Sequence, residues 1–158
     1  MKTRLLFILL SLLLCQWTIA QQTVSSGKLI EYYRFNSTIV PSRDVFVWLP
    51  TDYSTKERYD VLYMHDGQML FDANTTWNKQ EWGIDEVVGK LLNEKKIRPC
   101  IVVGVANIPE TRYADYFPQK ALRNLPDSVV SGNVSFNADN YLRFLVEEVK
   151  PFIDKEYS

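Results

Sequence analysis

Val61-Leu62-Tyr63-Met64-His65-Asp66-Gly67-Gln68, residues 61–68, joins an unbroken apolar run to an abrupt polar turn. An apolar strand that ends in a glycine-containing turn is typical of a central strand in a parallel sheet, covered on both faces. We therefore predict a buried strand over residues 59–64. The turn after it is the candidate site, because the chain contains no GxSxG, GxGxxG or GxxxxGKS motif.

The neighbouring segments predict the rest of an α/β domain. Two β-rich runs, 28–35 and 44–49, predict a strand pair, and the second run is apolar on both faces. From Glu81 onward, apolar residues recur every three or four positions and predict an amphipathic helix; they are Ile84, Val87, Val88, Leu91 and Leu92. Residues 100–105 form a further apolar run, so the order strand, helix, strand implies a right-handed crossover and a parallel pair.

The C-terminal third of the chain predicts a long loop and a helix. Residues 107–136 are polar and aromatic, and a loop of this length is usually functional or a lid. Residues 138–155 predict a helix that Asn137 or Asp139 caps and that Pro151 can kink. The acidic pairs of the two predicted helices are interpreted as solvated; they are Glu81 with Asp85, and Glu147 with Glu148.

The first twenty residues predict a secretory signal peptide, with basic Lys2 and Arg4, an apolar run over 5–14 and a small-residue cleavage site before Gln21. The apolar run is too short to span a bilayer, and Leu14 does not suit a lipoprotein signal at Cys15. We therefore divide the chain into a signal peptide, 1–20, and a single domain, 21–158. We expect a secreted or periplasmic protein with no membrane partner after cleavage.

Composition excludes several classes of protein. Eighteen Lys and Arg stand against nineteen Asp and Glu, and this near-neutral balance predicts no nucleic-acid partner. After cleavage Cys100 is the sole cysteine, so we expect no internal disulfide and a buried thiol. Because His65 is the one histidine, it cannot build a metal cluster by itself. We predict no metal and no organic cofactor.

The chain resembles the putative esterase family of the α/β-hydrolase superfamily, which includes esterase D, feruloyl and acetylxylan esterases, and enterochelin-esterase-like enzymes. The resemblance extends from about Val45 to Ser158 and rests on the segments 61–72, 81–85, 101–105 and 116–118, with Trp77 and Arg112. It implies a mostly parallel sheet with flanking helices. It also implies a serine carboxylic ester hydrolase that acts on a small-molecule or carbohydrate ester, such as a carbohydrate-linked or siderophore-type ester.

The resemblance assigns roles to the turn after the predicted strand. The backbone N–H of Gln68 is expected to stabilise the oxyanion of an acyl-transfer intermediate. His65, Asp66, Gly67 and Asp72 are expected to support this loop, with Gly67 allowing the tight turn. A catalytic role for His65 is a second interpretation, which the family disfavours because its base lies near the C-terminal end of the fold.

Three aromatic residues near this turn are candidates for substrate binding. Trp77, Trp82 and Tyr116 could stack on a sugar or aryl group of the ester. Ordinary core and loop packing is the alternative interpretation of all three. The sequons at Asn36, Asn74 and Asn133 are possible glycosylation sites whose use depends on the source.

In the family, the nucleophile elbow follows the helix at which this chain ends, and the acid and base come later. We therefore expect an incomplete α/β-hydrolase that stops before the elbow, lacks the triad and is inactive alone. Two alternatives stay open. One is a non-catalytic binding protein on a shortened hydrolase fold, and the other is an acyltransferase of the same fold.

In the usual hydrolase sheet the strand expected at 59–64 lies between two others, so a sheet without the next strand leaves an open apolar edge that favours pairing with another chain. We predict that the chain expressed alone is poorly soluble or oligomeric in size-exclusion chromatography. A sharp monomer peak together with cooperative unfolding would contradict this prediction.

Overall fold

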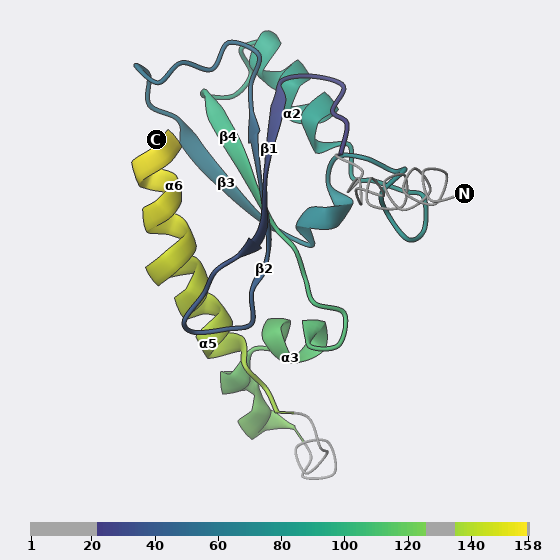
Figure 1. The fold of residues 1–158 in the computed structure, drawn as a ribbon, viewed down its shortest axis with the longest axis vertical. Coiled ribbons are helices and arrows are strands. Elements are labelled where there is room, and N and C mark those ends of the chain that lie inside the picture. Colours follow the sequence, from purple (N-terminus) through teal and green to yellow (C-terminus); the bar gives the residue numbers. More distant parts are fainter. Residues whose placement is uncertain (1–21, 126–134, 158) are drawn as a thin grey trace, which may run out of the picture.

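The computed structural model describes residues 22–125 and 135–157. The predicted signal peptide, Cys15 and the sequon at Asn133 lie outside these ranges. Four strands form one sheet with helices on both faces (Figure 1), which confirms the α/β class. The strands are β1 (Lys28–Phe35), β2 (Arg43–Leu49), β3 (Asp60–His65) and β4 (Cys100–Val105). No helix in the described ranges is long and apolar enough to cross a membrane.

The sheet has the order β1-β2-β4-β3. The parallel pair predicted from the strand, helix, strand order is confirmed, with Leu62 of β3 opposite Val102 of β4. The other two pairings in the described sheet, β1 with β2 and β2 with β4, are antiparallel. This part of the sheet is therefore mixed, with one parallel pairing among three. β3 forms one edge of the described sheet, and Leu62 is 43% exposed there. The prediction of a strand covered on both faces is therefore wrong for β3 in this part of the sheet, because no described strand pairs with its outer edge.

The central strands β2 and β4 are covered on both faces, as the continuous apolar runs predict. One face packs against the C-terminal helices, through residues that include Val45, Val47, Val103 and Val105. The opposite face, which includes Phe46, Trp48 and Val102, packs against α2 (Ile84–Asn93) and the segment that precedes it. Alternate residues of each strand therefore belong to two separate cores.

α2 begins at Ile84, three residues later than predicted, because Gly83 adopts a left-handed conformation with φ 60°. The predicted apolar face is correct for Val88 but wrong for Val87, which is 54% exposed. The expectation that Asp85 is solvated is also wrong, since its side chain is fully buried. Asp85 accepts hydrogen bonds from the N–H and hydroxyl of Ser25, and this long-range partner explains why a carboxylate faces inward.

The C-terminal helix is confirmed as one continuous helical segment in three parts: α5 (Ala138–Arg143), a π-helical stretch (Phe144–Val149) and α6 (Lys150–Tyr157). The π stretch lies just before Pro151, where the missing proline N–H and the bulk of the ring disturb regular α-helical bonding. Asn137 occupies the N-cap position but makes no side-chain cap bond. The predicted capping by Asn137 is therefore wrong.

The segment predicted as a long loop contains short helices. α3 (Arg112–Tyr116) and a 3₁₀ helix (Gln119–Asn124) follow β4, and residues 126–134 lie outside the described ranges. α3 packs against α5 and lies at the carboxyl end of the parallel strands (Figure 1). It is the element that positions the groups described below.

Gly67 is required by a close backbone approach and not by a positive φ. A Cβ atom at Gly67 would lie 2.6 Å from the carbonyl carbon of Gly104 in β4. A Cβ at Gly104 would in turn lie 3.0 Å from Gly67 Cα. The left-handed residue of the turn is Asp66, with φ 54°, so Gly67 permits the tight turn by its lack of a side chain against β4 and not by a positive φ.

We predict that Gly67→Ala lowers the free energy of unfolding by about 1–3 kcal/mol, because the added methyl group must displace backbone atoms of β4. Urea unfolding measures the loss, and amide NMR shifts at Gly104 and Val105 locate it. Gly83→Ala is the matched control, since a Cβ there meets only the Glu86 side chain. Its strain is local and should leave the β4 amides unmoved. Unchanged β4 shifts in Gly67→Ala would contradict the close approach.

Candidate active site

A cleft of about 600 Å³ opens beside the ends of β3 and β4. Ligands of α/β folds bind at this edge, where the carboxyl ends of parallel strands present their following loops. The lining residues come from the turn after β3, from the segment 72–83 and from the segment after β4. They are Asp66, Gln68, Met69, Trp77, Trp82, Asn107, Pro109 and Arg112.

The turn after β3, residues 66–69, presents backbone amides to its surroundings. Asp66 is left-handed, and a single 3₁₀ turn follows it over Gly67–Met69. The two bonds within this turn come from Met69 N–H to Asp66 O, at 2.8 Å, and from Leu70 N–H to Gly67 O, at 3.4 Å. The Gln68 amide donates neither of these bonds, as expected for the first N–H groups of a helical turn.

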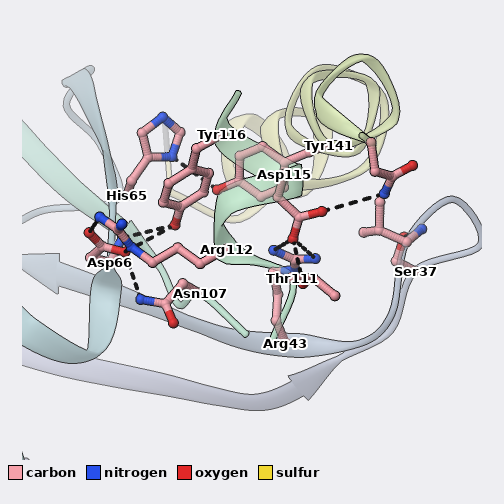
Figure 2. Close-up of polar contacts among 12 residues, drawn as sticks. Ser37, Arg43, His65, Asp66, Asn107, Thr111, Arg112, Asp115, Tyr116 and Tyr141 are labelled. Atoms are coloured by element: carbon pink, nitrogen blue, oxygen red, sulfur yellow. Dashed lines mark hydrogen bonds and ion pairs between the residues drawn. The ribbon is translucent and has the colours of Figure 1, made fainter. Parts of the chain in front are cut away.

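The carboxylate of Asp66 is the shared hydrogen-bond acceptor of the turn (Figure 2). Arg112 binds it through two nitrogens, with Nε at 2.9 Å and Nη2 at 2.7 Å. Asn107 Nδ2 donates at 2.7 Å and the Tyr116 hydroxyl at 3.2 Å. The bonds from Arg112 contribute most to lowering the pKa of Asp66, and those from Asn107 and Tyr116 add to the effect. Asp66 is therefore an ionised acceptor that joins the turn to α3.

Asn107 ties the end of β4 to the same turn. Its backbone N–H donates to Gln68 Oε1 at 3.1 Å, while its side chain binds Asp66. The Gln68 side chain is thus held by Asn107, and this contact helps to fix the backbone on which the Gln68 amide lies. Sequence reasoning assigned no role to Asn107. The available signal was its position directly after an apolar strand, at the same sheet edge as Asp66.

A neighbouring face of α3 is anchored in the core. Arg43 of β2 binds Asp115 Oδ2 through both terminal nitrogens, each at 3.2 Å, and both side chains are buried. Thr111 Oγ1 also donates to Asp115, at 2.9 Å. Arg112 and Tyr116, one helical turn apart, reach Asp66 from the other face of the helix (Figure 2). α3 is therefore held between two carboxylate networks, which fixes where Arg112 meets the turn.

His65 packs between two tyrosines, and it is not among the residues that line the cleft. Its Nδ1 lies 3.0 Å from the Tyr141 hydroxyl, and its ring centroid is 4.7 Å from that of Tyr116. Burial lowers the pKa of His65. This placement suits the supporting role that the sequence predicts for His65 beside the turn.

Tyr116 differs from its expected role as a substrate platform. Its ring lies between His65 and the Arg112 guanidinium, which is 5.1 Å from the ring centroid. Its hydroxyl binds Asp66, and its side chain is not among those lining the cleft. Tyr116 therefore positions Arg112 and Asp66 without lining the cleft itself.

The two tryptophans do line the cleft, and their side chains face solvent. Trp77 is 86% exposed and Trp82 is 62% exposed, so ordinary core packing does not account for them. Both lie on residues 72–83, which we call the tryptophan loop. Such exposed indole rings beside a cleft can stack on a flat ring of a ligand.

Asp72 supports the tryptophan loop and not the turn. It is 6% exposed and accepts bonds from the N–H and hydroxyl of Thr23, at 2.8 and 2.7 Å, and from the N–H of Asn74 at 2.8 Å. These bonds, with the Thr23 amide contributing most, lower the pKa of Asp72. The sequence therefore placed Asp72 near the site, but its contacts hold a different segment.

A metal centre is not formed by the described residues, which contain no group of three His, Cys, Asp or Glu side chains able to hold an ion. Cys100 lies at the opposite end of β4 from Asn107. It is partly buried, and burial raises the pKa of its thiol.

Comparison with known proteins gives a consistent family. The model of the family described as Putative esterase matches residues 37–158. The Bacillus subtilis protein YjcH is 26% identical over 132 residues, which cover 84% of this chain and 46% of YjcH. This chain therefore spans about half the length of the curated relative that it matches.

Two solved structures share the fold. An IroE-like serine hydrolase from Shewanella oneidensis is 25% identical, with a TM-score of 0.60 over 82% of this chain and 39% of that one. The BES protein from Bacillus cereus is 22% identical, with a TM-score of 0.56 over 90% of this chain and 51% of that one. The second likeness concerns the fold alone.

The Asp66–Arg112 pair predicts a pKa change that can be measured. In Arg112→Gln, the pKa of Asp66 should rise toward its ordinary value, because the strongest contact that lowers it is gone. NMR titration of the side-chain carboxyl carbon reports this value. Arg98→Gln is the control, because Arg98 forms an exposed ion pair with Asp60 and should leave Asp66 unchanged. An unchanged Asp66 titration in Arg112→Gln would contradict the assignment.

The lowered pKa of Asp66 also fixes the sign with which its contribution to stability depends on pH. Since folding lowers the pKa of Asp66, its contribution to stability is fully present above the ordinary aspartate pKa. The contribution is lost as the pH falls through the lowered value. We therefore expect the side-chain carboxyl carbon of Asp66 to show its own titration step only in stronger acid, below the ordinary aspartate range.

Proposed function

Because the chain belongs to the Putative esterase family, we propose that it supplies one side of the active site of a serine ester hydrolase. The observation that carries the proposal is the Gln68 amide, which lies in a turn beside the cleft and is not used by the bonds of that turn. In acyl transfer, a serine attacks the ester carbonyl and places a negative charge on its oxygen. We assign the Gln68 N–H as one donor to that oxyanion.

The remaining groups of the mechanism are not assigned within these 158 residues. In α/β-hydrolases the second oxyanion donor is the amide after the nucleophile, which follows a GxSxG turn, and an acid and a histidine base complete the triad. A histidine takes the serine proton and later returns it to the leaving alcohol. The proposed contribution of this chain is the oxyanion turn and a wall of the substrate cleft.

The charge balance of the turn supports an oxyanion role. An isolated carboxylate at Asp66, two residues from the Gln68 amide, would oppose a developing negative charge nearby. Arg112 neutralises this carboxylate through two hydrogen bonds. The turn therefore keeps an anionic residue as a structural hub without leaving an uncompensated negative charge beside the donor.

We further propose that the substrate is an ester with a flat aryl or sugar group, as in carbohydrate-linked or siderophore-type esters. The exposed rings of Trp77 and Trp82, both on the cleft, support this class of substrate. Secretion or export to the periplasm remains a proposal from the signal peptide predicted at residues 1–20, with the domain starting at residue 21.

The proposal is tested on the whole protein by hydrolysis of p-nitrophenyl acetate and by labelling with a fluorophosphonate, which reacts with an activated serine. We expect both reactions. Product analysis with an added alcohol separates hydrolysis from acyl transfer. Absence of both hydrolysis and labelling in the folded whole protein would reject the serine hydrolase assignment.

A matched pair of variants isolates the Gln68 amide. Gln68→Pro removes the N–H, and proline is tolerated in the first turn of a helical segment. Gln68→Ala keeps the N–H and removes only the side-chain bond to Asn107. We expect Gln68→Pro to lower kcat by about 10²–10³-fold, the usual effect of losing one oxyanion donor, and Gln68→Ala to lower it far less. Equal kcat values in two folded variants would exclude the amide as a donor.

A further inference from the structure

The first residues that the structure describes, 22–26, form an N-terminal strap. The strap runs across the outside of the core that lies between the sheet and α2. Trp48, a fully buried residue of β2, donates its indole N–H to the carbonyl oxygen of Ser26 at 2.7 Å. Gly89 of α2 allows the strap to approach, since a Cβ there would lie 2.5 Å from Ser26 Oγ. The strap is therefore fitted against both the sheet and α2.

The strap contacts the start of the tryptophan loop through Thr23. Both the N–H and the hydroxyl of Thr23 donate to one oxygen of Asp72. Asp72 is the first residue of the loop, and its other oxygen accepts the N–H of Asn74 within the loop. One carboxylate thus joins the strap to the loop.

The strap contacts the residues just beyond the end of the same loop through Ser25 and Ser26. The Ser25 N–H and hydroxyl donate to Asp85 Oδ2, at 2.6 and 2.9 Å. The Ser26 hydroxyl donates to the Asp85 carbonyl at 2.8 Å. Asp85 is in the first turn of α2, two residues after the loop ends at Gly83. Two buried aspartates therefore bracket the loop, and both bind the strap.

We propose that the N-terminal strap sets the position of the tryptophan loop, so that Thr23 and Ser25 are positioning residues that determine how the cleft accepts an ester. The geometry favours this role because the loop is irregular between its ends, and Trp77 is too exposed to be fixed by packing of its own. The backbone of Trp82 is better fixed, since its main-chain N–H donates to Met69 O at 3.0 Å. Loosening the strap should therefore move Trp77 more than Trp82.

The inference rests on the proposed function only where it concerns substrate, and a first test needs no substrate. In the whole protein without substrate, the indole N–H signals of Trp77, Trp82 and Trp48 are followed by ¹⁵N relaxation. The test variant is Thr23→Ala/Ser25→Ala, whose two side chains are solvent-exposed and can be shortened without opening the core. We expect faster motion at Trp77, a smaller change at Trp82, and none at Trp48.

A matched control exists at the other side of the molecule. Thr38 donates its N–H and hydroxyl to a single oxygen of Glu148, at 2.9 and 2.7 Å, in the same arrangement as Thr23 on Asp72. Thr38→Ala should leave all three indole signals unchanged. Relaxation in Thr23→Ala/Ser25→Ala that matches the wild type would overturn the proposal, because the Thr23 and Ser25 hydroxyl groups, which this variant removes, would then not be the positioning groups.

The second test separates positioning from general loss of structure in the whole protein. With a bulky aryl ester, Thr23→Ala/Ser25→Ala should raise KM by about two- to tenfold, the range for losing a hydrogen bond, with kcat within about twofold. With p-nitrophenyl acetate both constants should stay near the wild type. Thr23→Ser/Ser25→Thr keeps both hydroxyls and should restore KM.

The outcomes distinguish the two proposals. If the whole protein hydrolyses no ester but the indole relaxation changes as expected, the proposed function fails and the strap stands. If the protein is active and kcat falls for both esters without a change in KM, the strap has only a general structural effect and the inference is overturned.

Discussion

The ionised carboxylate of Asp66 accepts four hydrogen bonds at the end of β3, and the loops around it are arranged to supply them. A partly buried carboxylate without donors would cost free energy, and here the donors come from residues 41 to 50 positions away. To bring them together, β4 must end beside β3, and α3 must then turn back over the sheet edge. The parallel pairing of β3 and β4 and the close contact of Gly67 with Gly104 meet this requirement.

The two ion pairs on α3 contribute in different ways. Arg43 and Asp115 are almost fully buried, so the pair adds little net stability, but losing one partner would leave an uncompensated charge at a cost of about 3–5 kcal/mol. Arg112 is half exposed and its pair with Asp66 is worth less to folding. The buried pair therefore fixes α3 in the core, and the exposed pair uses that fixed helix to orient the turn.

Much of the fold was predictable, because the strands are continuous apolar runs and the parallel pair follows from their order. The ends of β1 and β4 coincide with the sequence prediction, since turn residues bound both runs. Asp85 could not be placed in the same way. Helical periodicity identifies apolar positions, but it cannot show that Ser25, sixty residues earlier, needs a buried acceptor. Nor can periodicity show that Asn107 binds Asp66. It also cannot show that Gly67 must lack a side chain because the neighbouring strand β4 lies against it.

The contacts around the cleft differ in kind, and the difference suits two tasks. A donor to an oxyanion has to be positioned within a fraction of an ångström, and the turn that carries Gln68 is held by an ion pair, backbone contact with β4 and the Asn107 bond. The tryptophans have to present flat surfaces, for which a small displacement matters less. Their loop has its own turn hydrogen bonds, such as those of the buried Thr76, and it is joined to the strap through Asp72 at its start and Asp85 just beyond its end. Rate and substrate acceptance can therefore depend on separate residues, because the fold attaches the turn to the sheet and the tryptophan loop to the strap.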